Sequence, residues 1–404
     1  MRFFRYSQRW CSVVLMTAAL ECAGQATATV KSESDRAFAL EQEGKLAESE
    51  AAWRAVLKVS PADAEAYAHL GLLEARQEHY GEAAPLYRKA LAINPAMPGL
   101  RMNLGLALFK SGAFKEAIAV FTPLLKSAPP DSPETQRVTA LLGLASYGTG
   151  DYAEAARYLK TAAAADPQNL QFRLVLAHSC LASRQFQCVL DTYHEILTLN
   201  AESAEADMLA GEALDEMHNT GGAIEQFRAA AKADPKEPNV HFGLGYLLWT
   251  QNQFEEAARE FEAELANVPD HAQALAFLAD AKMQTNRTEE ARPLLERAVK
   301  IDPRIGRAHL DLGILDGNEG HNAEALRELK EAARLMPGDA NPHWRMARLY
   351  QAMGNKAEAN VEFAKTRSLH QAENETIMKK LKAAQERGRP AGDADVPLGG
   401  TSPK

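Results

Sequence analysis

Two cysteines eight residues apart are the first candidates for covalent chemistry. Only Cys180 and Cys188 lie beyond the first 28 residues, and the hydrophobic pattern around them places the two side chains at facing ends of neighbouring helices. In an oxidising compartment they could form a disulfide. Otherwise they would be two small buried side chains, as free cysteine usually is. The sequence leaves both alternatives open.

Motifs for catalysis or for metal binding do not occur in the sequence. It contains no G-x-x-x-x-G-K-[ST], no H-E-x-x-H and no C-x-x-C, so it offers no phosphate loop, no zinc-protease helix and no dithiol pair. None of the 11 histidines stands at metal-ligand spacing from an acid or a cysteine. His178 and Cys180 are two residues apart, which on a helix directs them to different faces. We therefore expect no enzyme activity, no cofactor and no metal.

The composition and net charge of the chain limit the classes of partner that it is expected to bind. The chain has 404 residues and a net charge of −9, and it has no long basic run. Such a chain has no general attraction to nucleic acid or to an anionic membrane. Its 46% hydrophobic content is ordinary for a folded protein. Abundant alanine and few β-branched residues favour helices.

Prolines recur at a fixed period. This period predicts where the helices that carry the candidate residues begin and end. Pro61, Pro95 and Pro129 are 34 residues apart; Pro167 follows after 38 and Pro235 after 68, which is twice 34. The same step of 34 then leads to Pro269, Pro303 and Pro337. A period of this length is typical of a two-helix repeat stacked into a solenoid. We expect each proline to follow the end of a second helix, because proline cannot continue one.

Other residues repeat in phase with the prolines. Leu70-Gly71 is followed by Ala83, Tyr87 and Pro95, and the next repeat has Leu104, Gly105, Ala117, Phe121 and Pro129 at the same places. This pattern resembles the tetratricopeptide repeat (TPR) family. The resemblance implies an all-α, right-handed superhelical solenoid of about ten antiparallel helix-turn-helix units. We expect Gly71 to let Ala83 approach closely. We also expect a left-handed glycine in the turns at Gly44, Gly112, Gly150, Gly320 and Gly354.

The period divides the chain into segments. Residues 30–131 hold repeats one to three and residues 136–373 hold repeats four to ten, each 34 residues long. The insertion 132–135 predicts a longer connector and a bend or hinge. Residues 374–387 predict a capping helix, and the Gly- and Pro-rich residues 388–404 a disordered tail.

The TPR resemblance implies a ligand groove lined by the first helix of each repeat. Residues in phase with the family's contact positions are apolar and aromatic here, and the candidates are Phe109, Tyr147, His178, Phe242, Tyr246 and Trp249. Tyr246 and Trp249 are the strongest, since aromatic side chains carry much interface energy. The alternative is that most of these side chains only pack against the neighbouring repeat. An acidic patch in the sixth repeat is either a solvated face or a rim for a basic peptide. It consists of Glu205, Glu212, Asp215 and Glu216.

The N-terminus has the pattern of an export signal. Arg2, Arg5 and Arg9 precede a short apolar run, and Ala26-Thr27-Ala28 fits a cleavage site, so residues 1–28 are predicted to be a signal peptide. The run is short for a membrane span. We expect a periplasmic or secreted protein without an integral membrane segment in the mature chain. An uncleaved N-terminal anchor and a cytoplasmic protein are the alternatives.

These features together predict a non-enzymatic scaffold for protein–protein interaction, which binds a peptide or a partner protein in the concave groove of a TPR array. The alternative is a structural accessory subunit of a bacterial cell-envelope assembly or secretion machine. The sequence leaves the oligomeric state open.

Overall fold

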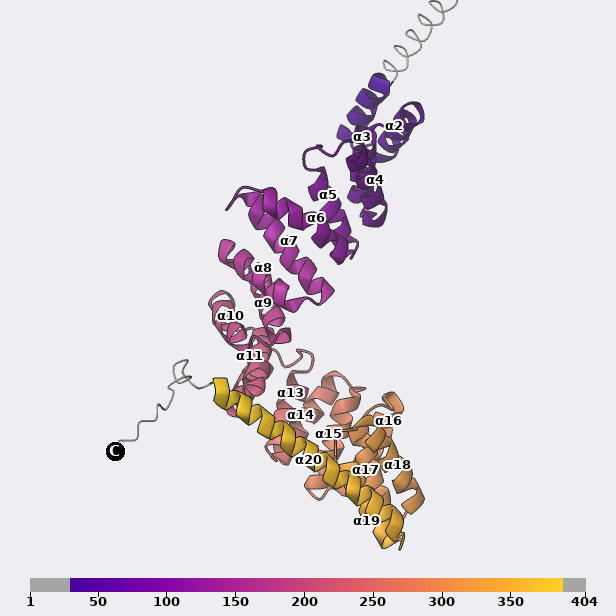
Figure 1. Ribbon diagram of the computed structural model, residues 1–404, viewed down its shortest axis with the longest axis vertical. Helices are drawn as coiled ribbons and strands as arrows, with labels where there is room; N and C mark the ends of the chain where they lie inside the picture. The colour runs from indigo at the N-terminus through magenta and orange to yellow at the C-terminus, as the bar shows by residue number, and fades with distance from the viewer. Residues whose placement is uncertain (1–29, 388–404) are drawn as a thin grey trace, which may run out of the picture. The chain divides into compact units, whose positions relative to one another are not determined.

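Helices make up the ordered framework of the chain. This computed structural model describes residues 30–387, and these residues contain no strand. The all-α prediction is therefore confirmed. The chain divides into two compact blocks, with the boundary between His218 and Asn219. Figure 1 shows each block as a run of helices that fold back on one another in chain order.

The N-terminal block holds the helices up to the first helix of the sixth repeat. It contains a helix over residues 30–42, α2 (Leu46–Val59), α3 (Ala64–Arg76), α4 (Tyr80–Ile93), α5 (Leu100–Lys110), α6 (Phe114–Ser127), α7 (Pro133–Thr149), α8 (Tyr152–Ala165), α9 (Leu170–Ala182), α10 (Phe186–Leu199) and α11 (Ala204–Glu216).

The C-terminal block begins with the second helix of the sixth repeat. It contains α12 (Thr220–Ala233), α13 (Val240–Thr250), α14 (Phe254–Asn267), α15 (Ala272–Gln284), α16 (Thr288–Ile301), α17 (Gly306–Asn318), α18 (Asn322–Leu335), α19 (Asn341–Ala352) and α20 (Lys356–Arg387). No helix within residues 30–387 combines the length and the hydropathy needed to cross a bilayer.

The prolines mark the ends of second helices, as predicted. The helices α2, α4, α6, α8, α12, α14, α16 and α18 each end two residues before a proline of the period. The turn inside each pair is equally regular. Gly44, Gly112, Gly150, Gly320 and Gly354 have φ between 75° and 84°, which confirms their expected left-handed conformation. At the same place in the other five pairs stand Glu78, Arg184, His218, Asn252 and Asn286, with φ of 57° to 63°.

The Leu-Gly pair packs against a different residue from the one expected. A Cβ atom on Gly71 would lie 2.7 Å from the ring of Tyr87, so Tyr87, and not Ala83, occupies the space that glycine leaves. The ring of Tyr87 is 1% exposed, because it lies between the two helices of its own pair. The same contact, sixteen residues along the chain, joins Gly105 to Phe121, Gly143 to Leu159, Gly245 to Phe261 and Gly313 to Leu329.

Two predicted boundaries differ from the structure. Residues 132–135 do not form a long connector: Ser132 is the N-cap of α7, its Oγ accepts a hydrogen bond from the Thr135 N–H at 3.2 Å, and the helix begins at Pro133. The predicted capping helix 374–387 is not a separate element, because α20 runs unbroken from Lys356 to Arg387. The predicted signal peptide, residues 1–28, and the predicted disordered tail, residues 388–404, lie outside the described residues.

Candidate functional site: the surface of the first helices

In each block the first helices of successive pairs touch one another. The helix α3 contacts α5, and α7 and α11 both contact α9; in the C-terminal block α15 contacts α13 and α17, and α17 contacts α19. The first helices of a block therefore share a face, which we call the first-helix surface. All six predicted groove residues lie on first helices, namely on α5, α7, α9 and α13.

Two of the predicted residues in the N-terminal block contact the second helix of their own pair. The ring of Phe109 lies 5.5 Å from Phe114 of α6, and the ring of Tyr147 lies 5.6 Å from Tyr152 of α8, both edge to face. Phe109 is half-buried against the core, whereas Tyr147 is exposed. Phe109 therefore contributes to packing, and Tyr147 is the one of the two that offers its ring to solvent.

His178 bridges two first helices. Its Nε2 lies 2.8 Å from a carboxylate oxygen of Glu205, so it joins α9 to α11. Arg184 donates to Glu216 at 2.7 Å between the same two pairs. Two carboxylates of the predicted acidic patch thus already have partners within the block, which leaves less negative charge to select a basic peptide.

The structure gathers the other three predicted residues into an aromatic cluster. Phe242, Tyr246 and Trp249 share one face of α13, with ring centroids 6.5 Å and 6.1 Å apart along the helix. Phe277 of α15 completes the cluster and lies edge to face with Tyr246 at 5.4 Å and with Trp249 at 5.1 Å. Such edge-to-face pairs are favourable beyond the area that they bury. Tyr246 stays 39% exposed and forms the solvent side of the cluster.

A chain of buried polar contacts fixes the inner side of the cluster. The indole Nε1 of Trp249 donates to the carboxylate of Asp280 at 2.5 Å. Arg307 of α17 forms an ion pair with the same carboxylate, and its guanidinium lies 5.0 Å from the Trp249 ring. Arg307 also donates to Asp311 at 3.0 Å. Asp280 and Asp311 are both 1% exposed, and Arg307 is the cation that pairs with both of them.

Burial changes the protonation of Asp311. Desolvation raises the pKa of its carboxyl group to about 7; Arg307 opposes this rise and Asp280 adds to it. The Oδ1 atom of Asp311 has no hydrogen-bond partner among the described residues. The carboxyl group is therefore balanced between its neutral and ionised forms near neutral pH.

Phe277, Asp280 and Arg307 were not predicted from the sequence, and the last helical pair, α19 with α20, holds two more candidates. Phe242 and Tyr246 have counterparts 102 residues later, three periods of 34, in Trp344 and Arg348 of α19. Extending the period to the tenth repeat would have found them. Phe277 has no such signal, because the same place in the preceding repeat is Gly243.

Cys180 and Cys188 lie next to each other, with their Cα atoms 5.9 Å apart, which is within the range found in disulfides. The pair links α9 to α10 within one repeat. The backbone geometry therefore accommodates a disulfide without rearrangement.

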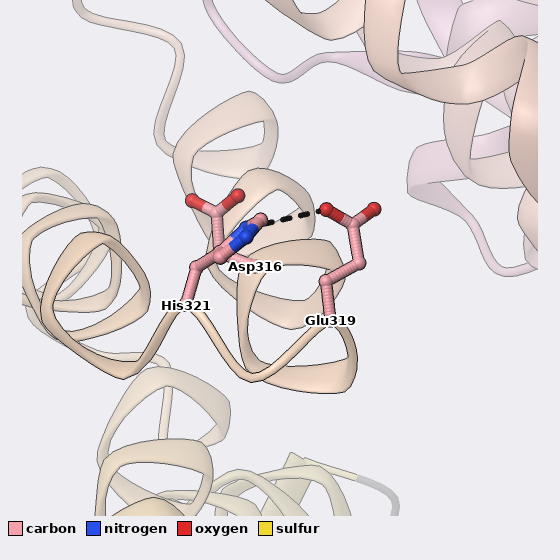
Figure 2. Close-up of side chains that lie close together, drawn as sticks. All are labelled: Asp316, Glu319 and His321. Atoms are coloured by element: carbon pink, nitrogen blue, oxygen red, sulfur yellow. Dashed lines mark ion pairs between the residues drawn. The ribbon is translucent and has the colours of Figure 1, made fainter.

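Three potential metal ligands meet at the end of α17 (Figure 2). The nearest donor atoms of Asp316, Glu319 and His321 lie within 4.8 Å of one another. However, one nitrogen of Arg292 donates to both Asp316 and Glu319, each at 2.9 Å. Arg292 thus supplies the positive charge that a cation would bring, and we interpret the group as an ion-pair network.

Comparison with known families agrees with the helical pairs. One tetratricopeptide repeat model matches residues 35–98, 208–261 and 242–304, and a second matches residues 74–142 and 147–213. The chain belongs to the tetratricopeptide repeat family. TPR proteins bind protein or peptide partners.

Curated relatives share only part of their length with this TPR chain. It is 24% identical to the protein CTR9 homolog of Arabidopsis thaliana over 70% of this chain and 27% of that protein. It is 32% identical to the peroxisomal targeting signal receptor of Eremothecium gossypii over 29% of this chain and 22% of that protein. The chain thus spans about a quarter of the length of these relatives.

Solved TPR structures are similar at low sequence identity. A tetratricopeptide repeat protein from Parabacteroides merdae has a TM-score of 0.47 and 16% identity, covering 62% of this chain and 97% of its own. Yeast Tom70 has a TM-score of 0.39 and 12% identity, covering 90% and 97%. YrrB, described as a TPR protein with an unusual peptide-binding site, has a TM-score of 0.36 and 20% identity, covering 44% and 91%.

Proposed function

We propose that this TPR protein is a non-enzymatic scaffold that binds an extended segment of a partner protein on the first-helix surface of its C-terminal block. The observation that carries the proposal is the aromatic cluster, in which an exposed Tyr246 lies against Trp249 and Phe277. Its chemistry suits an apolar or aromatic side chain of the partner. The net charge of −9 argues against nucleic acid as the ligand.

The rigidity of Trp249 supports its role as an anchor. Asp280 and Arg307 hold the indole in one orientation through a hydrogen bond and a cation–π contact. A side chain that is already ordered loses little conformational entropy when a ligand binds, so more of the contact energy remains as affinity. Aromatic residues in such positions are frequent hot spots of interfaces.

We further propose that the protein is exported to the periplasm or secreted. The support is the basic and apolar pattern of residues 1–28 together with the placement of Cys180 and Cys188, whose Cα separation of 5.9 Å suits a disulfide, since disulfides persist in oxidising compartments. An uncleaved N-terminal segment would instead leave the array anchored at a membrane.

Affinity capture with the full chain tests the proposed surface. Tyr246→Ala combined with Trp249→Ala should remove the captured partner. A matched variant, Ile93→Ala with Val361→Ala, removes two exposed apolar side chains from the second helices α4 and α20 and should capture as the wild type does. Circular dichroism of each variant controls for folding.

Equal capture by wild type and by the Tyr246–Trp249 variant would refute the assignment of this surface. A partner recovered at a fixed stoichiometry that resists high salt would instead favour the accessory-subunit role in an envelope machine.

A further inference from the structure

A second recognition point lies on the same surface, between α17 and α19. Trp344 occupies the place of Phe242 in its repeat, and Arg348 occupies the place of Tyr246. Trp344 is 39% exposed. The guanidinium carbons of Arg345 and Arg348 lie 5.0 Å and 5.7 Å from its ring centroid. The end of the block thus presents two cations around one aromatic ring.

Arg345 and Arg348 have no anionic partner among residues 30–387, although both surround one aromatic ring. The Nε of Arg345 is buried and has no hydrogen-bond partner among residues 30–387. Neither Arg345 nor Arg348 forms an ion pair there, whereas Arg307 of the neighbouring first helix binds two carboxylates. A buried hydrogen-bond donor without an acceptor is unfavourable. A ligand that supplied an acceptor to the Arg345 Nε–H would therefore be favoured at this site.

A cavity of about 250 Å³ adjoins these arginines. Its wall includes Gly317, which stands at the place that Trp249 occupies two repeats earlier. The missing side chain leaves the space open. Its lining is mixed, with Ile314, Leu329 and Leu349 as apolar members beside the two arginines. The volume accommodates a side chain of the size of leucine.

The electrostatic environment of Arg345 is incompletely balanced. Burial lowers the pKa of its guanidinium, Asp311 raises it and Arg307 lowers it further. An arginine stays charged despite such a shift. Asp311 also interacts with Arg307 and has a free Oδ1, so it neither hydrogen-bonds to Arg345 nor fully neutralises it.

We propose that this site binds a carboxylate side chain of a partner segment, with the carboxylate on Arg345 and Arg348 and a neighbouring apolar side chain in the cavity beside Gly317. The ligand is therefore a short stretch in which leucine-like and acidic residues adjoin. The site deepens the proposed function, since it lies on the same first-helix surface as Tyr246 and rests on that surface being the one that binds partners. Planar guanidinium groups match carboxylates in geometry as well as in charge.

Arginine side-chain resonances test the site directly. The full chain is labelled with ¹⁵Nε-arginine, and the Arg345 signal is assigned by its loss in Arg345→Lys. The probes are N-acetyl-Leu-Glu-Leu-amide and its neutral counterpart N-acetyl-Leu-Gln-Leu-amide. Arg327 of α18 serves as an internal control, because its Nε is exposed and already donates to Glu328 at 3.2 Å.

The Glu peptide should shift the Arg345 signal and bind roughly tenfold more tightly than the Gln peptide, because a charge-assisted hydrogen bond is about twice as strong as a neutral one. Gly317→Met should weaken both peptides by filling the cavity. Equal shifts with both peptides, no shift at all, or an equal shift of Arg327 would overturn the proposal. The proposal would also be overturned if Asp311→Asn shifted the Arg345 signal while neither peptide did. Arg345 and Asp311 would then be partners of each other in solution, and Arg345 would not be free to bind a ligand.

The test of the carboxylate site can fail without the proposed function failing. Tyr246→Ala with Trp249→Ala leaves the Arg345 titration unchanged if both accounts hold. Loss of capture in that variant without any response of Arg345 would refute the carboxylate site alone.

Discussion

The indole of Trp249 and the carboxylate of Asp280 join two neighbouring repeats, with a distance of 2.5 Å between Nε1 and the oxygen. The carboxylate is buried and also forms an ion pair with Arg307 of the next repeat. Three successive first helices are therefore linked through one acidic group. This link makes the aromatic cluster part of the stable framework of the C-terminal block.

Arg307→Ala should strongly destabilise the C-terminal block. The change leaves Asp280 and Asp311 buried without their cation, and breaking a buried pair in this way costs about 3–5 kcal/mol. Urea unfolding followed by circular dichroism measures the loss. Arg327→Ala removes an exposed arginine from α18 and should have little effect. Similar unfolding curves for the two variants would contradict the structural role of the network.

Asp311 should make the folded state less stable as the pH rises from about 4 to about 7. Burial raises the pKa of Asp311 from 3.8 to about 7, so between these values the folded chain holds a proton that the unfolded chain has released. Rising pH therefore weakens folding in this range, and the effect is complete above the folded-state pKa. The neutral side chain of Asp311→Asn removes this contribution.

The free energy of unfolding of Asp311→Asn and of wild type is measured as a function of pH. All other titrating groups are common to the two proteins, so the difference between the two curves reports on Asp311 alone. We expect the variant to gain stability relative to wild type between pH 4 and pH 8, by up to a few kcal/mol. A difference that stays constant across this range would show that the carboxyl group is ionised throughout.

Gly105→Ala should destabilise the third repeat. A Cβ atom there would lie 2.4 Å from Cε1 of Phe121, a ring that is fully buried. The resulting overpacking costs about 1–3 kcal/mol. Gly81→Ala is the matched control, because a Cβ at Gly81 meets nothing within 4 Å. Thermal unfolding should separate the two variants, and equal melting temperatures would argue against the Gly–Phe contact.

The Cys180–Cys188 pair should be oxidised in protein recovered from the cell. Alkylation in denaturant without reductant, followed by mass measurement of the peptides that contain Cys180 and Cys188, should leave both cysteines unmodified unless the protein is first reduced. A loop of eight residues predicts a stabilisation of roughly 2 kcal/mol, which Cys188→Ala would lose under oxidising conditions only. Two alkylated cysteines in unreduced protein would contradict both the disulfide and its support for export.

The period in the sequence predicted most of the fold, because proline ends helices and a left-handed residue reverses the chain wherever they occur. It could not predict the extent of α20. The tenth repeat has Gln371 where eight other repeats have proline, and its helix continues to Arg387. The fifth repeat also lacks the proline, with Ala201 at that place, yet α10 ends at Leu199, so the missing proline permits a longer helix but does not predict one. The contact of Gly71 with Tyr87 was also missed, since phase alone does not show which side chain fills a gap.

The candidate site was predicted only in part. Phase placed Phe242, Tyr246 and Trp249 on one face of α13, and that face is where they lie. Their partners Phe277 and Asp280 come from α15. Asp280 stands one period after Tyr246, so the period marks its place but not its contact with Trp249, and no repeated pattern marks Phe277. Non-repeating contacts between helices arise from three-dimensional packing. The period therefore indicates a surface but not which of its residues form a cluster.

Site-specific photo-crosslinking at Tyr246 tests the central claim most directly. The full chain carries p-benzoylphenylalanine at position 246 or, as a control, at Val361, which is 54% exposed on the second helix α20. Both proteins are irradiated in the native host. The account predicts a discrete, light-dependent adduct with one partner protein from position 246 and none from position 361. Adducts of equal yield from both positions, or none from position 246, would contradict it.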